Sequence, residues 1–297
     1  MMRNKVLLLA VLIFALPNFC YALQMPSDVN ELAQSLGLSA RSYLVMDKTT
    51  GQILVSKEPD LLWPPASLAK LVTVMVALDA KPKLTKAVAM KKADEVGGAR
   101  LATKSGVAYR VKDLLYATLV ASANNAANAL ARSTGFSQAE FVEKMNQKAK
   151  ALGAKNTIFF EPSGISEKNQ TTVSDFSKIA KAAFENPLIA AAAATSAYSF
   201  RATNNKKYFH KLKNTNKLLG DAELADIKGK TGYLEESMHN FAAVAKDSGG
   251  NEFLVVLFGS DSSASQFKET KELFQLGSMA VLINNFKLAV LGTSTPN

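Results

Sequence analysis

Apolar and polar positions alternate near both ends of the chain, which predicts β-strands there. Residues 42–47 and 52–56 are short β-type runs joined by a glycine-containing turn, so they predict a β-hairpin. Residues 225–233 and 240–245 predict two further strands, and residues 253–258, which are apolar throughout, predict a buried one. The two ends of the chain are therefore expected to contribute strands to one antiparallel sheet.

Helical spacing of apolar residues predicts that the middle of the chain is helical. The run that follows Pro64 and Pro65 is free of Gly and Pro up to Leu78, which indicates a buried helix with Ser67 in its first turn. Further helices are predicted at residues 28–36, 111–119, 138–152, 173–184, 188–195 and 267–283. With no repeat and no low-complexity linker, the predicted fold class is α/β of the α+β type, an antiparallel sheet flanked by helices with an inserted helical subdomain.

The first 22 residues predict a secretory signal peptide. Two basic residues precede an unbroken apolar run from Val6 to Leu16, and small residues lead to a cleavage position after Ala22. A run of that length is too short to span a bilayer as a membrane anchor. The residues before Cys20 lack the small side chains that a lipoprotein site needs. We therefore expect an exported protein.

The charge balance narrows the expected partners. The chain of 297 residues has 35 Lys and Arg against 25 Asp and Glu, and removal of residues 1–22 leaves 33 against 25, a net charge of about +8. For an exported protein this excess favours an anionic cell-wall polymer or a membrane surface over nucleic acid, although it can also serve solubility alone. Cys20 is the only cysteine, so the mature chain is expected to have no disulfide, no cysteine nucleophile and no thiolate metal site.

Ser67 and Lys70 form the first candidate for catalysis. They lie three positions apart and so share one face of the predicted helix. Burial and the positive end of a helix both disfavour the ammonium form, which makes a neutral Lys70 available as base for the Ser67 hydroxyl. A serine helix cap beside a solvated lysine gives the same pattern. Neither His210 nor His239 has neighbours that complete a metal-binding motif, so no metal and no cofactor is expected.

Two later motifs decide between these interpretations. S-A-N at residues 122–124 follows a predicted helix, and K-T-G at residues 230–232 lies in a late predicted strand. With Ser67 and Lys70 they resemble, in order and placement, the S-x-x-K, S-x-N and K-T-G motifs of penicillin-binding proteins and class A β-lactamases. More narrowly, over about residues 42–276, the sequence resembles the D-alanyl-D-alanine carboxypeptidase family of low-molecular-mass penicillin-binding proteins, peptidase family S11.

Three supporting segments carry the same resemblance. Residues 65–70 are similar to the family's P-A-S-L-T-K, with Ala69 where the family usually has Thr. Residues 160–165 are similar to its F-x-x-P-x-G-L loop, and residues 213–219 to its N-x-N-x-L-L segment. The resemblance implies the transpeptidase fold of penicillin-binding proteins and β-lactamases. The expected organisation is a signal peptide at 1–22, a lead-in at 23–40, a DD-peptidase catalytic domain at 41–285 and a C-terminal tail at 286–297.

The resemblance also implies the catalytic residues. Ser67 is implied as the acylated nucleophile, Lys70 as its general base and Ser122 as a proton relay to the leaving amine. The backbone N–H groups of Ser67 and Tyr233 are implied as the oxyanion hole.

Four further residues are implied in substrate binding. Asn124 is expected to hold Lys70 and the substrate amide, and Lys230 to keep Lys70 neutral and attract the substrate carboxylate. Thr231 is expected to hydrogen-bond that carboxylate. Gly232 is expected to let the substrate approach the strand edge closely.

The implied function is a serine-type D-Ala-D-Ala carboxypeptidase or DD-endopeptidase that acts on peptidoglycan stem peptides and is inhibited by β-lactams. The chain looks most like short, single-domain DD-endopeptidases, so we expect a periplasmic or cell-wall location, no stable membrane anchor and no nucleic-acid partner. A β-lactamase is the nearest alternative, but no segment resembles the class A deacylation loop with its Glu. A non-catalytic peptidoglycan-binding protein is another, against which the three intact motifs argue. No arginine follows Arg201, and Lys268 is the late basic residue expected to assist carboxylate binding.

Overall fold

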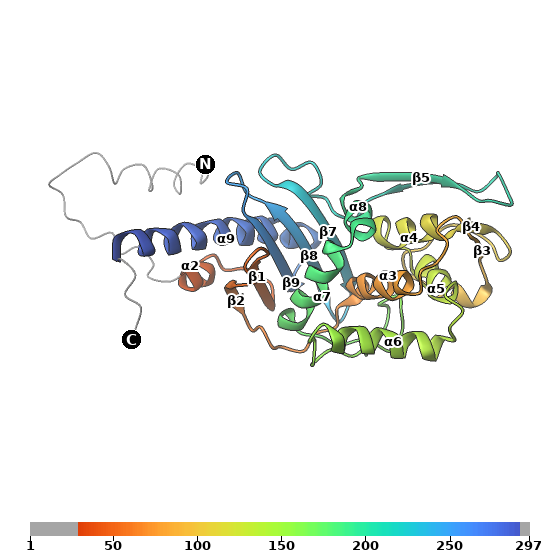
Figure 1. Ribbon diagram of the computed structural model, residues 1–297, viewed down its shortest axis with the longest axis horizontal. Coiled ribbons are helices and arrows are strands. Elements are labelled where there is room, and N and C mark those ends of the chain that lie inside the picture. Colours follow the sequence, from red (N-terminus) through yellow and green to blue (C-terminus); the bar gives the residue numbers. More distant parts are fainter. Residues whose placement is uncertain (1–28, 292–297) are drawn as a thin grey trace.

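The computed structural model describes the backbone of residues 29–291 and the side chains of residues 29–285 (Figure 1). The predicted signal peptide, residues 1–22, and the first part of the predicted lead-in lie outside the described residues. The end of the predicted tail, residues 292–297, also lies outside them. Between residues 29 and 291 no helix is both long and apolar enough to cross a membrane.

One five-stranded antiparallel sheet joins early and late segments of the chain (Figure 1). Its strands, in spatial order, are β2 (Ile53–Lys57), β1 (Ser42–Asp47), β9 (Glu252–Ser260), β8 (Met238–Lys246) and β7 (Ala225–Leu234). The predicted hairpin and the three predicted late strands are confirmed. Strand β1 pairs with β9 in a register that sets Tyr43 opposite Leu257, so the first and last strands in sequence are neighbours in the sheet.

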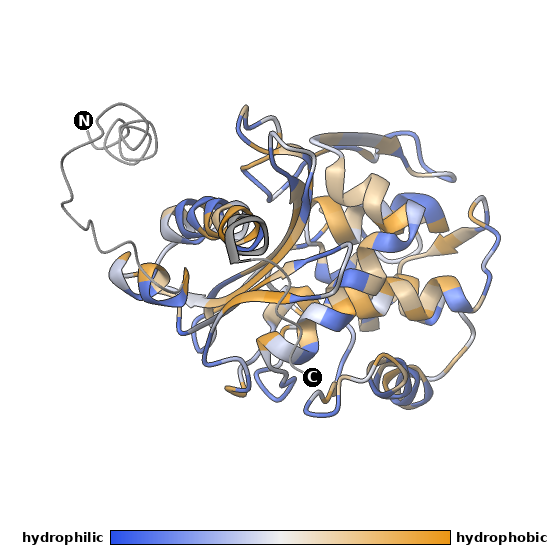
Figure 2. Ribbon diagram, turned by 60° about the vertical axis from the view of Figure 1, so that its left-hand side comes forward, coloured by the Kyte–Doolittle hydropathy of each residue, from blue (hydrophilic) through white to orange (hydrophobic). Residues whose placement is uncertain are grey.

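Both faces of the sheet are covered because its central strands are apolar on both sides. Residues 253–258 of β9 alternate between the two apolar clusters of the molecule, one on each face. Helices α2 (Val29–Ser35) and α9 (Ser263–Leu291) cover one face, and the helical subdomain covers the other. Figure 2 shows apolar residues concentrated in the sheet and where helices pack on it. Each large apolar side chain buried there stabilises the fold by about 1.5–3 kcal/mol.

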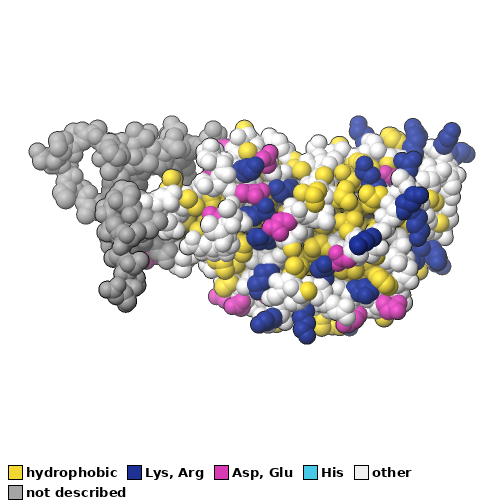
Figure 3. Space-filling model, viewed as in Figure 1, with side chains coloured by type: hydrophobic (Ala, Val, Ile, Leu, Met, Phe, Trp, Pro, Cys, Tyr) yellow, Lys and Arg dark blue, Asp and Glu magenta, His cyan; other side chains and the backbone are white. Residues whose placement is uncertain are grey.

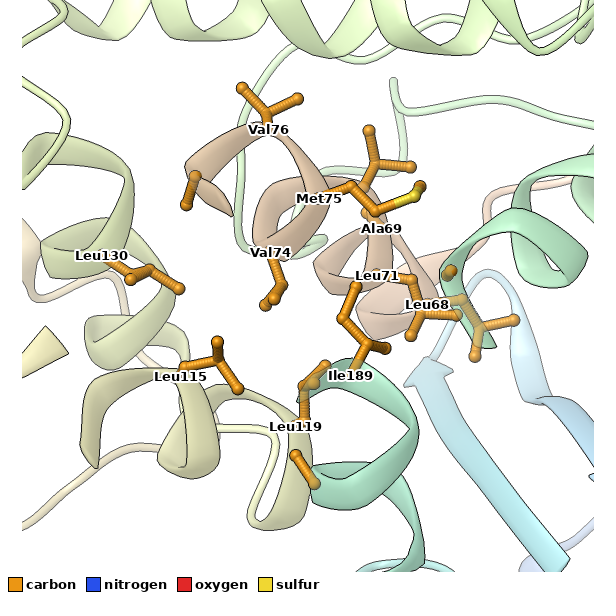
Figure 4. Close-up of a cluster of buried hydrophobic side chains, with 14 of the residues drawn as sticks. Leu68, Ala69, Leu71, Val74, Met75, Val76, Leu115, Leu119, Leu130 and Ile189 are labelled. Carbon is orange, nitrogen blue, oxygen red and sulfur yellow. The ribbon is translucent and has the colours of Figure 1, made fainter. Parts of the chain in front are cut away.

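The helical subdomain is inserted between β2 and β7. It contains α3 (Lys70–Asp79), α4 (Val111–Val120), α5 (Asn124–Arg132), α6 (Gln138–Ala151), α7 (Val173–Glu185) and α8 (Pro187–Ala194). Helix α3 lies at its centre, where Leu71 meets Leu119 of α4 and Ile189 of α8 (Figure 4). Ala69, where the family usually has Thr, is 0% exposed in the same apolar cluster. A small apolar side chain therefore suits this position.

Several elements differ from the sequence-based prediction, among them helix α5, which is absent from the predicted helices. Short hairpins form between β3 (Ala87–Ala89) and β4 (Ala108–Arg110), which flank the 3-10 turn η3 (Lys92–Asp94), and between β5 (Ala197–Arg201) and β6 (Phe209–Lys213). The β5–β6 hairpin extends along the helical subdomain, away from the five-stranded sheet (Figure 1). Helix α9 is longer than the predicted 267–283 at both ends and includes the first residues of the predicted tail.

Candidate active site

The turn that carries Ser67 is held in an unusual conformation. Ser67 lies in a 3-10 turn, η2 (Ala66–Ala69), and α3 begins only at Lys70, so the serine precedes the α-helix and is not in its first turn as predicted. Ala66 has a φ of 50°, a conformation that costs an ordinary residue roughly 1–2 kcal/mol. Asn240 fixes the approach to the turn, because its Nδ2 donates to Pro64 O at 2.9 Å.

Two glycines allow neighbouring segments to reach this turn. A Cβ at Gly164 would overlap Ala66 O and lie 3.0 Å from Ser67 Cα, and a Cβ at Gly232 would lie 2.7 Å from Pro65 O. Both positions therefore require glycine. This packing is a further reason for glycine at position 232, beside the expected close approach of a substrate, which stays a prediction. The space beside Gly232 is filled by the protein's own backbone, which packs β7 against the Ser67 turn.

Lys70 places its amine against Ser67 from a fully buried position. The side chain is 0% exposed, and Nζ lies 2.7 Å from Ser67 Oγ and 2.7 Å from Asn124 Oδ1. The Ser163 carbonyl oxygen is a third partner of Nζ. Burial lowers the pKa of Lys70 to about 7, while the negative charge of Glu161 acts in the opposite direction. At neutral pH much of the amine is therefore unprotonated and able to accept a proton from the Ser67 hydroxyl.

A second lysine and serine lie beside the first pair. Lys230 on β7 is 1% exposed, and its Nζ donates to Ser122 Oγ at 2.8 Å and to Thr231 O at 2.7 Å. Burial lowers the pKa of Lys230, and the charge of Lys70 lowers it further. By reciprocity, a charged Lys230 disfavours protonation of Lys70. Ser122, between α4 and α5, has a φ of 57°, so its backbone is held in a rarely populated conformation.

Asn124 connects the site to a loop of the helical subdomain. Its Oδ1 accepts from Lys70, its Nδ2 donates to Gly97 O at 2.8 Å, and its backbone N–H donates to Ala99 O at 2.6 Å. A Cβ at Gly98 would lie only 2.8 Å from Asn124 Nδ2. The amide is therefore fixed on both sides, with its oxygen directed towards Lys70.

The outer end of the site is polar and accessible. Thr231 Oγ1 donates to Thr215 Oγ1 at 2.6 Å. Tyr233 is 57% exposed, and its ring centroid lies 4.5 Å from that of His239. Among the strands that the structure describes, β7 has a sheet neighbour on one side only, so its other edge can pair with an extended peptide.

Three residues at the site are absent from the sequence-based prediction: Glu161, Ser163 and Thr215. All three lie in segments that resemble family motifs, and this resemblance is the feature of the sequence that could have identified them. Glu161 organises its loop, because its carboxylate accepts from Ser163 N at 2.7 Å, Ser163 Oγ at 2.5 Å, Asn169 Nδ2 at 2.9 Å and Ser166 N at 3.3 Å. These contacts hold the segment whose carbonyl oxygen meets Lys70.

Other candidates from the sequence lie elsewhere. Lys268 has a side chain that is 74% exposed and pairs with Glu272 on the same helix. His210 is buried on the inner face of the β5–β6 hairpin, where its Nε2 lies 2.8 Å from Tyr109 Oη. Within residues 29–285, no group of three or more His, Cys, Asp or Glu side chains is placed to hold a metal ion.

Known proteins resemble this chain over most of its length. A family model described as D-alanyl-D-alanine carboxypeptidase, Peptidase S11, matches residues 29–261. The D-alanyl-D-alanine endopeptidase of Pseudomonas aeruginosa is 34% identical over 242 residues, which cover 80% of this chain and 77% of that protein.

Solved structures share the fold. The D-alanyl-D-alanine carboxypeptidase of Mycobacterium tuberculosis superimposes with a TM-score of 0.74 at 29% identity, over 82% of this chain and 92% of that one. A Streptomyces DD-transpeptidase superimposes with a TM-score of 0.76 at 26% identity, over 82% of this chain and 98% of that one. The expected penicillin-binding-protein fold is thus confirmed, and the chain belongs to the D-alanyl-D-alanine carboxypeptidase family, peptidase family S11.

Proposed function

We propose that the protein is an exported serine DD-peptidase that hydrolyses D-Ala-D-Ala or cross-link bonds in peptidoglycan stem peptides. The observation that carries this proposal is the 2.7 Å contact of Lys70 Nζ with Ser67 Oγ, in a site where burial lowers the pKa of Lys70 to about 7. Family membership supplies the substrate class. The matching family model describes carboxypeptidases, and the Pseudomonas aeruginosa relative is an endopeptidase.

The proposed reaction has two halves. Neutral Lys70 accepts the Ser67 hydroxyl proton as Oγ attacks the carbonyl carbon of the penultimate D-Ala, and the Oγ–C bond forms. Backbone N–H groups of Ser67 and Tyr233 stabilise the oxyanion. The C–N bond then breaks, and the leaving amine receives the proton held by Lys70 by way of Ser122. Water attacks the resulting ester and Lys70 accepts its proton. The ester C–Oγ bond then breaks, and Lys70 returns the proton to Ser67 Oγ, which restores both groups.

Substrate recognition is proposed to use the accessible end of the site. The terminal carboxylate would meet the hydroxyls of Thr231 and Thr215 within the positive potential of Lys230, and Asn124 would bond the substrate amide. The peptide would lie along the free edge of β7. β-Lactams, which mimic D-Ala-D-Ala, are expected to acylate Ser67.

Purified mature protein is expected to release free D-Ala from a pentapeptide muropeptide or to convert a cross-linked dimer into monomers. The endopeptidase relative favours the second outcome. Chromatography of both reactions, with fluorescent penicillin labelling in parallel, measures the result. Rapid turnover of a chromogenic cephalosporin without stable labelling would instead identify a β-lactamase. A protein that takes no label and cleaves neither muropeptide would be a peptidoglycan-binding protein.

Glu161 is proposed as a positioning residue for Lys70. Four donors fix its carboxylate, and two of them belong to Ser163, whose carbonyl oxygen is a partner of Lys70 Nζ. The carboxylate also favours the charged form of Lys70. It therefore both holds an acceptor against the base and keeps the pKa of Lys70 from falling further.

Glu161→Gln is expected to move the acid limb of the acylation rate to lower pH. Protonated Lys70 cannot accept the Ser67 proton, so the wild-type rate rises as pH increases through about 7. Removing the negative charge lowers the pKa of Lys70, because Glu161 is the group that opposes the lowering caused by burial. The rate on the alkaline side should fall, by up to about a hundredfold if the Ser163 carbonyl is displaced. Penicillin acylation measured from pH 5 to 9 records both effects.

Glu167→Gln is the matched control, since Glu167 is exposed on the same loop. Its acid limb should coincide with that of wild type. An acid limb that stays in place in Glu161→Gln, or moves equally in both variants, would contradict the proposed role of Glu161.

A further inference from the structure

We propose that the outer face of the β5–β6 hairpin binds the anionic peptidoglycan polymer and holds it over the Ser67 site. The identity of this polymer rests on the proposed function. Five cations on the hairpin form what we call the basic ridge: Arg201, Lys206, Lys207, Lys211 and Lys213. The segment 197–213 that carries them contains no Asp and no Glu. A local excess of this kind creates a positive field that attracts polyanions.

The two faces of the hairpin differ in character. Strand pairing sets Phe200 opposite His210 and Tyr198 opposite Leu212 on the inner face. The Tyr198 ring stacks on Tyr116 with centroids 4.1 Å apart, and its hydroxyl donates to the buried Asp113 at 2.7 Å. The carboxylate of Asp113 is therefore turned away from the ridge, and the inner face is committed to packing.

The outer face is exposed and its charges have no carboxylate partners. All five ridge cations are exposed, and none of them forms an ion pair within the part of the chain that the structure describes. The Arg201 guanidinium lies 4.5 Å from the ring centroid of Phe209, which is itself 49% exposed. Figure 3 shows Lys and Arg side chains along the edge of the molecule where Figure 1 draws this hairpin.

The hairpin is also anchored at its tip, so binding would not have to order it. Thr203 N donates to Ala108 O at 2.8 Å, and Ala108 N donates to Asn204 Oδ1 at 2.9 Å. Asn204 Nδ2 donates to Gly106 O at 2.8 Å. A surface held in place loses little conformational entropy when a partner binds.

In the sequence, the last residue of the ridge is followed within two positions by a residue of the catalytic cluster. This continuity favours the substrate polymer as the partner of the ridge. The residue after Lys213 is Asn214, whose Nδ2 donates to Thr195 O at 2.8 Å, and the next is Thr215, which accepts from Thr231. Stem peptides of peptidoglycan carry free carboxylates. A peptidoglycan strand bound along the ridge would therefore bring its stem peptides close to Ser67. For a polymer that is not a substrate, the nearness of the ridge to Ser67 would have no consequence.

The double variant Lys207→Glu/Lys211→Glu tests the ridge by co-sedimentation with purified sacculi stripped of protein and phosphate polymers. At low salt its bound fraction should fall about tenfold or more relative to wild type. Wild-type binding should also weaken in about 1 M salt, where charges are screened beyond roughly 3 Å. Penicillin acylation and turnover of a soluble cross-linked dimer should be unchanged, while cleavage of intact sacculi should fall with binding.

Lys150→Glu/Lys155→Glu is the matched control, because it reverses two exposed lysines at the end of α6 and changes the net charge equally. It should bind sacculi as wild type does. Equal loss of binding in both variants, wild-type binding by the ridge variant, or tighter wild-type binding to polyphosphate beads than to sacculi would each overturn the proposal. Ridge-dependent binding by a protein that cleaves no muropeptide would support the ridge and reject the proposed function.

Discussion

Ser67→Ala is expected to abolish stable labelling by fluorescent penicillin and to lower peptidase turnover by about six powers of ten. Loss of a serine nucleophile removes the covalent route altogether, and effects of this size are typical when such a nucleophile is deleted. In the wild-type protein Lys70 is 0% exposed, and Ser67 is only one of the three hydrogen-bond partners of its Nζ. Since Asn124 and Ser163 stay in place, the variant should still fold, as its thermal unfolding would report.

The matched control is Ser199→Ala, which removes an exposed hydroxyl on β5 and should label like wild type. Equal labelling of Ser67→Ala and wild type would place the acylated group elsewhere and reject the mechanism. Binding of the stem peptide should survive in Ser67→Ala, because the groups proposed to hold the carboxylate and amide are intact.

Gly164→Ala is expected to have the largest effect on stability and to impair acylation at the same time. The added Cβ would overlap Ala66 O, and Gly164 has a φ of 78°. The conformation alone costs about 1–2 kcal/mol, and the overlap should add roughly 1–3 kcal/mol. Because relief of the overlap must move the Ser67 turn or the Ser163 carbonyl, acylation should fall about a hundredfold. Chemical denaturation and penicillin acylation measure the two effects.

Gly153→Ala separates the two causes. Gly153 has a φ of 77°, but a Cβ there would meet only Lys178 Cδ at 3.9 Å. It should show the conformational cost without the overlap, and its acylation rate should equal that of wild type. If the two alanine variants were equally stable and equally active, the packing of Gly164 against the Ser67 turn would not be required.

Much of this fold could be predicted because its apolar pattern is strong. The run at residues 253–258 and the helix after Pro65 are buried on all sides, so their composition alone indicates core elements. The β5–β6 hairpin has no such strong apolar run. Its outer face is mostly polar, and on its inner face a few aromatic side chains of the hairpin pack against α4. Its stability comes from tertiary packing, which local patterns do not encode.

The active site, like the fold, could be predicted only in part from the sequence. The motifs S-x-x-K, S-x-N and K-T-G identify Ser67, Ser122 and Lys230 as candidates, but the pairings among them depend on the fold. The contact of Lys230 with Ser122 joins β7 to the α4–α5 connection. The contribution of Glu161 depends on a loop whose carbonyl oxygen reaches α3. No periodicity in the sequence specifies such contacts.

The pairing of β1 with β9 also governs how the protein can fold. Tyr43 and Leu257 meet only after the intervening chain has been brought together, and contacts so distant in sequence make folding slow. During synthesis the residues of the helical subdomain leave the ribosome before those of K-T-G and β9. The emerging chain therefore exposes the apolar face of β1 and lacks a complete catalytic cluster until nearly the whole domain is present. Activity should accordingly be acquired late and all at once during refolding, in step with formation of the central strand pair.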